Sequence, residues 1–335
     1  MNRPDGCPTQ SLPGGWRRFA LCVAGLHVLG LLLWIPALPG HPFLLGMGLV
    51  AYTFGLRHAL DADHIAAVDN TVRKLTEQRH DPSGVGFFFA LGHATVVILT
   101  AIATTFAMHW VERALPGFES AGGVIGGTVS GLFLLIVGLI NLAILGRTLQ
   151  LARRPGKPGP GASPAGPFTA LLWPLFRFVN RSWHVYPIGF LFGLGFDTAS
   201  EVALLSMSAS AAHQAVPVSG LAALPILFSA GMTLLDTADG VWMASAYRWA
   251  FSDPVRKLRY NLTVTSVSVA AALTIGVIEL VQVWSTRLGL DEGIWKSLQD
   301  LDIGPLGVVL ILVLAAIWGV AAVASRASRR RGVST

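Results

Sequence analysis

Ten residues in the first quarter of the chain constrain its fold: Leu56-Arg57-His58-Ala59-Leu60-Asp61-Ala62-Asp63-His64-Ile65. Five of them carry ionisable side chains, yet residues 42–51, just before them, are apolar enough for a membrane. A charged group at the centre of a bilayer costs about 2.5–3.5 kcal/mol on insertion scales. Such groups persist in a membrane helix only where they have partners or a function. Two imidazoles and two carboxylates this close together are ligands that a borderline divalent metal prefers.

The composition outside this stretch is that of an integral membrane protein. The chain has 335 residues, of which 53% are hydrophobic and 13% are charged. This is far too apolar for an ordinary soluble protein, and several apolar runs reach the roughly 20 residues that span a bilayer as a helix. The two cysteines, Cys7 and Cys22, provide neither a disulfide framework nor a thiolate cluster. We therefore predict an all-α integral membrane protein.

The apolar runs predict eight transmembrane helices, and the basic residues predict their orientation. If the N-terminus lies inside, twenty lysines and arginines fall on the inner side and three on the outer side. This positive-inside bias predicts a multi-pass protein of the cytoplasmic (inner) membrane with both termini in the cytoplasm. The predicted spans cover residues of about 17–36, 43–69, 85–108, 122–146, 185–210, 218–246, 260–285 and 304–324.

The spans fall into two membrane halves, residues 17–146 and 185–324, with four spans each. Between them, residues 147–184 are rich in proline, glycine and basic side chains, which predicts a flexible cytoplasmic linker. Residues 1–16 form a cytoplasmic tail, and residues 325–335 form a second, basic one.

Short sequence matches relate the two halves. Phe-Gly-Leu occurs at 54–56 and 192–194, and Phe-x-x-Gly occurs at 89–92 and 228–231. Matching copies are three spans apart, so the topology gives them opposite orientations. An inverted repeat of three-helix units is a common transporter plan, with the substrate site between the repeats near the midplane. Since the shared residues are few and mostly apolar, chance similarity is the alternative explanation.

The second span predicts one continuous helix, on which the positions of its polar groups follow from helix geometry. His58, Asp61 and His64 follow one another at i, i+3 and i+6, so they share a face of about 120°, whereas Asp63 points away. Either the helix is distorted here, or Asp63 makes a different contact. An ordinary Arg57–Asp61 pair within the helix is the alternative, but the density of ionisable groups argues against it.

Three further spans carry polar groups near their middle. His93 lies in the third span, although a lone intramembrane histidine is more often a packed residue than a ligand. Asp197 and Glu201 are i, i+4 in the fifth span, and Asp236 and Asp239 are i, i+3 in the sixth. Two such carboxylates repel each other, so each pair requires protons, partners or a metal ion.

The excess of acids within the spans predicts a bound cation. The predicted spans contain seven acidic residues, Glu279 included, but only one clearly basic residue, Arg57. Mg²⁺ and Ca²⁺ prefer oxygen ligands, whereas imidazoles shift the preference towards Ni²⁺, Co²⁺, Zn²⁺ or Cu²⁺, and the lack of thiolates argues against Cu⁺. We therefore predict a site for a late first-row divalent metal between the midplane and the inner face. Its candidate ligands are His58, Asp61, Asp63, His64, His93, Asp197, Glu201, Asp236 and Asp239.

At these residues the chain resembles the nickel/cobalt transporter family of membrane permeases. The family signature Arg-His-Ala-x-x-Ala-Asp-His-Ile stands at 57–65, and three further motifs have counterparts at 92–97, 194–201 and 231–239. Ala94 departs mildly from the Ser or Thr usual in the family. The resemblance implies eight spans, cytoplasmic termini and uptake of Ni²⁺ or Co²⁺, with His58, Asp63 and His64 central to metal handling. Exporting relatives often carry a histidine-rich loop. The sequence between residues 147 and 183 has no histidine tract, so the resemblance favours import over export.

The membrane potential suffices to drive this import. A doubly charged ion gains about 4.6 kcal/mol per 100 mV when it moves inward. The sequence has no Gly-x4-Gly-Lys-Ser/Thr motif, so we expect no ATPase partner and no cofactor. The expected partners are the metal ion and membrane lipid, and no nucleic acid, since the basic residues sort by membrane side. The sequence does not indicate the oligomeric state or a preference between Ni²⁺ and Co²⁺.

Three other functions remain open at this stage. One is a Ni²⁺/Co²⁺ exporter of the same superfamily. Another is an intramembrane metal-dependent enzyme, although the chain contains neither His-Glu-x-x-His nor Gly-x-Ser-x-Gly. The third is a substrate-binding subunit of a larger ATP-driven importer, which would transport only with its partner ATPase.

Overall fold

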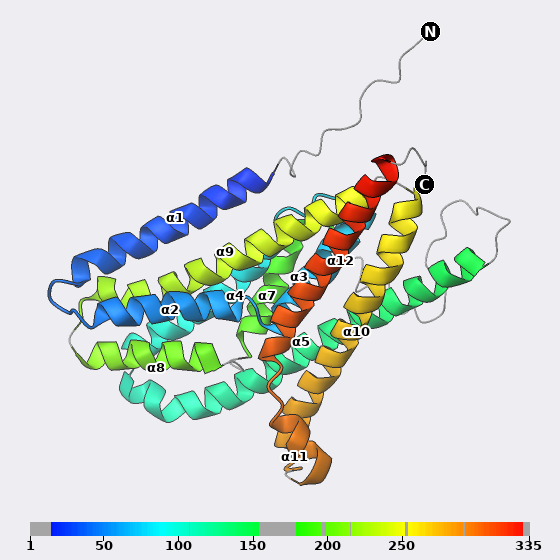
Figure 1. Cartoon of the computed structure of the whole chain (residues 1–335). Helices are drawn as coiled ribbons and strands as arrows, with labels where there is room; N and C mark the ends of the chain where they lie inside the picture. Colours follow the sequence, from blue (N-terminus) through cyan, green and yellow to red (C-terminus); the bar gives the residue numbers. More distant parts are fainter. Residues whose placement is uncertain are drawn as a thin grey trace.

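The computed structural model describes residues 15–106, 108–153, 179–195, 199–214, 216–251, 254–290 and 292–330, and these residues form a helical bundle (Figure 1). The helices are α1 (Trp16–Trp34), η1 (Ile35–Ala37), α2 (Leu44–His58), α3 (Ala62–Glu77), α4 (Val85–Phe106), α5 (Met108–Arg153), η2 (Ser182–Val185), α7 (Tyr186–Gly193), α8 (Ala199–His213), α9 (Val218–Phe251), α10 (Pro254–Arg287), α11 (Gly293–Gln299) and α12 (Gly304–Arg330).

Several helices are long and apolar enough to cross a membrane, which confirms the predicted class. Within the described residues there are five such stretches: Trp16–Ala37, Val85–Thr104, Gly123–Ala143, Val218–Trp249 and Leu262–Arg287. They correspond to the first, third, fourth, sixth and seventh predicted spans. A shorter apolar stretch, Pro305–Val320, lies at the predicted eighth. Helix length therefore supports five of the eight spans directly.

The predicted second span is not one continuous helix, so the ideal-helix placement of its polar groups was wrong. Helix α2 ends at His58, and α3 begins at Ala62. Between them Asp61 has extended backbone, with φ −67° and ψ 148°, where a helix would need ψ near −42°. In the predicted fifth span, α7 ends at Gly193 and α8 begins at Ala199, and residues 196–198 between them lie outside the described residues. Non-helical backbone at membrane depth is tolerated where protein surrounds it.

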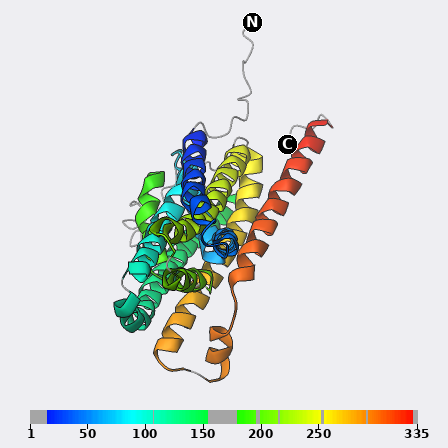
Figure 2. The same cartoon turned by 90° about the vertical axis from the view of Figure 1, so that its left-hand side faces the viewer.

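Protein does surround the break between α2 and α3. An added Cβ at Gly307 of α12 would overlap the backbone at Leu60 and Asp61, so α12 packs directly on the turn. Ala59 and Asp61 are both buried. Figure 2 shows α12 at the edge of the bundle, joined to α10 through the short helix α11. The break therefore lies inside the protein, where its side chains can meet those of other helices.

Helix α9 lies at the centre of the packing around the break. It contacts α1, α2, α3 and α4, while α5 runs along α10 (Figure 1). Helix α5 extends to Arg153, into the stretch predicted as a linker, and residues 154–178 of that stretch lie outside the described residues. Residues 1–14 of the predicted N-terminal tail also lie outside them. Helix α12 extends to Arg330, into the predicted C-terminal tail, of which only residues 331–335 lie outside the described residues.

The end of α3 provides a test of backbone strain. Arg79 has a φ of +59°, and two hydrogen bonds close the turn: His80 N donates to Leu75 O (2.8 Å) and Arg79 N donates to Thr76 O (3.1 Å). This is the Schellman arrangement, in which glycine is favoured at the left-handed position. A non-glycine residue in left-handed backbone costs about 1–2 kcal/mol of folding free energy. Glycine recovers this cost but increases the conformational entropy of the unfolded chain, so Arg79→Gly should stabilise the protein by about 0.5–1 kcal/mol.

Thermal unfolding in detergent measures this effect. The matched control is Gly289→Ala, because Gly289 has a φ of +66° in the same kind of turn after α10. The control should lower the unfolding temperature while Arg79→Gly raises it. A lower unfolding temperature for Arg79→Gly would show that the arginine side chain itself stabilises the loop.

Candidate metal centre

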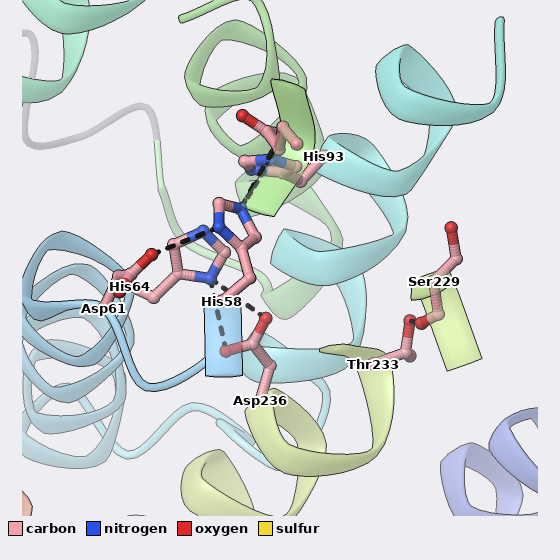
Figure 3. A network of polar contacts seen from close by, with 8 residues as sticks. His58, Asp61, His64, His93, Ser229, Thr233 and Asp236 are labelled. Carbon is pink, nitrogen blue, oxygen red and sulfur yellow. Dashed lines mark hydrogen bonds and ion pairs between the residues drawn. The ribbon is translucent and has the colours of Figure 1, made fainter. Parts of the chain in front are cut away.

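Three imidazoles from three helices meet inside the bundle (Figure 3). His58 is the last residue of α2, His64 lies in the first turn of α3, and His93 lies in α4. Their ring centroids are 4.6 Å (His58–His64), 4.7 Å (His58–His93) and 4.9 Å (His64–His93) apart. One nitrogen from each ring lies within 4.8 Å of the others, and all three residues are at most 3% exposed. This spacing suits ligands that share one metal ion.

The break between α2 and α3 brings two of these rings together. On a continuous helix His58 and His64 would be about 9 Å apart along the axis. The turn at residues 59–61 instead lets both rings face the same point, in edge-to-face contact. On α4 the residue before His93 is Gly92, where an added Cβ would overlap the backbone of Tyr186 on α7. That close approach positions His93 against the pair.

Two carboxylates approach the Nδ1 atoms on the outer side of the imidazole cluster. Asp61 Oδ2 lies 3.2 Å from His58 Nδ1, and Asp236 Oδ2, on α9, lies 3.2 Å from His64 Nδ1. A carboxylate that accepts from Nδ1–H leaves Nε2 as the lone-pair nitrogen and holds the ring in place. This is the usual support for metal-binding histidines, and Asp236 gives it to His64. Asp61 Oδ2 is an acidic neighbour of the His58 ring but makes no hydrogen bond to it.

The Nε2 atoms face one another and a third carboxylate. His58 Nε2 lies 3.0 Å from His93 Nε2, and Glu201 Oε1 of α8 lies 2.6 Å from His93 Nε2 and 3.8 Å from His58 Nε2. His64 Nε2 is buried and has no hydrogen-bond partner. Buried polar atoms are usually paired, so an orphaned imidazole nitrogen aimed at two others indicates a ligand position. Three imidazoles and one glutamate are a donor set for a borderline divalent metal.

Aromatic side chains enclose the cluster. The Phe89 ring contacts His64 edge-on, with centroids 4.8 Å apart, and the Phe228 ring lies 5.6 Å from His58. Both phenylalanines are fully buried. They are the first residues of the two Phe-x-x-Gly matches, which sequence reasoning noted as repeat markers but not as walls of the site. An apolar shell limits water access and strengthens the electrostatic attraction of the acids for a cation.

The structure brings together six of the nine predicted site residues: His58, Asp61, His64, His93, Glu201 and Asp236. Asp63 is only half-buried, and within the described residues no hydrogen bond or ion pair holds it. Asp239 lies one turn beyond Asp236, and Asp197 lies outside the described residues. The alternative Arg57–Asp61 pair is not formed, because Arg57 is exposed and Asp61 turns to His58.

Comparison with known proteins identifies nickel-transport and cobalt-transport proteins as relatives of this chain. Residues 44–324 match the family model NicO, described as high-affinity nickel-transport protein. The nickel transporter NixA of Staphylococcus aureus is 47% identical over 90% of this chain and 92% of its own length. The high-affinity nickel-transport protein NixA of Helicobacter pylori is 46% identical (88% and 92%), and the cobalt transport protein NhlF of Rhodococcus rhodochrous is 42% identical (78% and 80%).

No solved structure was found to match the chain. The relatives are transport proteins rather than enzymes, which removes the intramembrane enzyme from the open alternatives. The family model covers the break at residues 59–61 and every residue of the imidazole cluster. The chain is therefore a member of the NicO family of high-affinity nickel-transport proteins.

Proposed function

We propose that this protein is a secondary permease that imports Ni²⁺ or Co²⁺ across the cytoplasmic membrane. The observation that carries the proposal is the buried cluster of His58, His64 and His93 with Glu201 beside it. Relatives named as nickel transporters, and one named as a cobalt transport protein, point to the same two ions. Asp63, Asp197 and Asp239 remain proposed participants, because they lie near this cluster in sequence.

The donor set accounts for selectivity and for charge. Late first-row ions bind imidazole nitrogen well, so three imidazoles can replace their water ligands. Mg²⁺ and Ca²⁺ prefer oxygen, so they would exchange water for imidazoles that bind them more weakly. Glu201, Asp61 and Asp236 supply the negative charge that compensates the dehydrated ion. The ion is then held by groups from both halves of the chain, with α2, α3 and α4 on one side and α8 and α9 on the other.

The two halves provide a basis for alternating access. In the α2–α9 pair, Gly55 lies against the Phe228 carbonyl and Gly231 against the Tyr52 carbonyl. In the α7–α4 pair, Gly189 lies against the Phe89 carbonyl and Gly92 against the Tyr186 carbonyl. The two pairs use the same reciprocal contact with the halves exchanged, which supports an inverted repeat. In these contacts Gly189 is the counterpart of Gly55. The Phe-Gly-Leu match in the sequence instead pairs Gly55 with Gly193, which lies one helical turn after Gly189.

The proposed topology has eight spans, two of them interrupted. Residues 17–146 and 185–324 form the halves, residues 147–184 link them, and both tails lie in the cytoplasm. Interrupted helices that meet at the midplane between inverted repeats are the usual location of a transported ion. Rocking of one half against the other then exposes the imidazoles first to the outside and then to the inside.

Uptake by the purified chain in proteoliposomes tests this function. With an inside-negative potential of 100 mV we expect accumulation of radioactive Ni²⁺, driven by about 4.6 kcal/mol. Excess Co²⁺ should compete and excess Mg²⁺ should not. The control is the same vesicles with the potential collapsed. Uptake that requires an added ATPase would identify the binding-subunit alternative, and export under the same gradient would identify the exporter.

A further inference from the structure

A second group of buried polar side chains lies apart from the imidazoles, where α3 meets α5, α9 and α10. Its members are all at most 5% exposed, and none of them belongs to the predicted metal site. They form two neighbouring sets of hydrogen bonds, one around Asp69 and one around Asn70 and Arg73, which together join four helices. We call this group the α3 latch, and it consists of Asp69, Asn70, Arg73, Asn141, Tyr247, Thr265 and Ser268.

Asp69 is the acid at the centre of the α3 latch. The Tyr247 hydroxyl of α9 donates to Asp69 Oδ1 at 2.6 Å, and the Ser268 hydroxyl of α10 donates to Asp69 Oδ2 at 2.6 Å. Hydrogen bonds to an ionised carboxylate are short and about twice as strong as neutral ones. Through one side chain, α3 is therefore fastened to two other helices at once.

A second connection lies one turn further along α3. The Arg73 guanidinium donates to the Thr265 hydroxyl of α10 at 2.6 Å and to Asn70 Oδ1 at 3.3 Å. The same Asn70 oxygen accepts from Asn141 of α5 at 2.7 Å. The positive charge of Arg73 balances Asp69, so the latch is neutral overall, and its polar groups depend on α3 staying in place.

The latch lies next to the metal centre along the two helices that carry it. Asp69 follows His64 by five residues, about 7.5 Å along α3. On α9, Asp239 follows Asp236 by one turn, and its Oδ2 atom is buried without a hydrogen-bond partner. Asp239 is thus an unpaired acid between the imidazole cluster and the latch.

We propose that the α3 latch is the inner gate of the metal path. The proposal rests on the proposed function, because it assumes that the ion leaves towards the cytoplasmic end of α3. An ion that moves from His64 to Asp239 attracts the Asp69 carboxylate and competes with the hydroxyls of Tyr247 and Ser268. Asp69 then leaves these two donors, and α3 is released from α9 and α10. The transported ion itself thereby opens the metal path towards the cytoplasm.

A cysteine-accessibility experiment tests the gate. Val68 is 1% exposed and faces Gly240 of α9, so Val68→Cys reports separation of α3 from α9. The full-length chain with Cys7→Ser and Cys22→Ser carries this reporter, and inside-out vesicles are treated with a membrane-impermeant maleimide. Tyr247→Phe and Ser268→Ala each remove one hydroxyl. Each should raise the labelling rate roughly tenfold or more, since a hydrogen bond to a charged group is worth at least that factor.

A tyrosine and a serine outside the α3 latch provide matched controls. Tyr186→Phe removes a hydroxyl that bonds Thr95 at 3.0 Å, and Ser266→Ala removes one that donates to Leu262 O on the exposed side of α10. Both should leave the labelling rate unchanged. Ni²⁺ binding in detergent must stay within roughly threefold of the parent in every variant, which shows that the protein is folded and the imidazole site intact.

The outcomes separate the gate from the proposed function. Faster labelling in Tyr247→Phe and Ser268→Ala, and in the parent on addition of Ni²⁺, supports the gate. Unchanged labelling in both variants overturns it, even where the parent binds and transports Ni²⁺. If the parent neither binds nor transports Ni²⁺, the proposed function fails instead. Equal acceleration in the control variants would show a general loosening of the bundle and would also overturn the gate.

Discussion

His64→Ala is expected to abolish nickel uptake and to weaken Ni²⁺ binding by roughly a hundredfold or more. The substitution removes an imidazole whose Nε2 atom is buried and points at the other two rings. It also leaves the Asp236 carboxylate, 1% exposed, without the ring that it contacts at 3.2 Å. Loss of an outer-shell partner alone typically costs 10–100-fold in metal affinity, so loss of the ligand should cost more. Titration of purified protein with Ni²⁺ and uptake in proteoliposomes measure the two effects.

Two further variants make this result specific. Asp236→Asn keeps the shape but removes the charge that orients His64, so we expect an intermediate loss of about 10–100-fold in affinity. His80→Ala changes an exposed histidine in the loop after α3 and should leave binding and uptake at the parental level. Full uptake by His64→Ala protein of normal abundance would show that the imidazole cluster is not the metal site.

Gly55→Ala is expected to have the largest effect on folding. A Cβ at this position would overlap the carbonyl oxygen of Phe228, and a backbone atom inside a helix cannot rotate away as a side chain can. Helices α2 and α9 must then separate, which moves His58 of α2 away from Phe228 of α9, whose ring centroid lies 5.6 Å from that of His58. Overpacking of this kind costs about 1–3 kcal/mol and more where the backbone has to shift. We expect a lower unfolding temperature, reduced abundance in the membrane and no uptake.

The control lies on the same helix. Gly46 of α2 has no atom within 4 Å of an added Cβ, and it is exposed. Gly46→Ala should be neutral or slightly stabilising, because alanine is favoured over glycine inside a helix by about 1 kcal/mol. If Gly55→Ala unfolded at the same temperature as Gly46→Ala, the close approach of α2 and α9 would not be required for the fold.

Much of the candidate site was predictable because donor chemistry is a local property. The imidazoles of His58 and His64 and the acids of 194–201 and 231–239 are conspicuous in apolar segments, and their cost in lipid implies a function. His93 alone was ambiguous. The structure places His93 in the imidazole cluster, since His93 Nε2 contacts both His58 and Glu201.

The roles of the acids were not predictable in the same way. Helix geometry assigned Asp61 to the ligand face, and the family resemblance emphasised Asp63. In the structure Asp61 Oδ2 lies 3.2 Å from His58 Nδ1, while Asp63 is half-buried and makes no hydrogen bond or ion pair within the described residues. The reason is the break at residues 59–61, which changes the direction of every side chain after it. No periodicity rule for a continuous helix can anticipate such a change.

The sequence by itself determined that this is a helical membrane protein, and it predicted a positive inner side and a donor set for a late first-row divalent metal, because hydropathy, charge and ligand chemistry reside in single residues and short runs. The choice of Ni²⁺ or Co²⁺ came from the family resemblance. Only the tertiary structure decided which groups meet. Glu201 reaches His93 from 108 positions away and Asp236 reaches His64 from 172. Such pairs depend on how α8 and α9 pack against the broken helix, and packing between distant elements is set by the shape of whole interfaces rather than by any one stretch of chain.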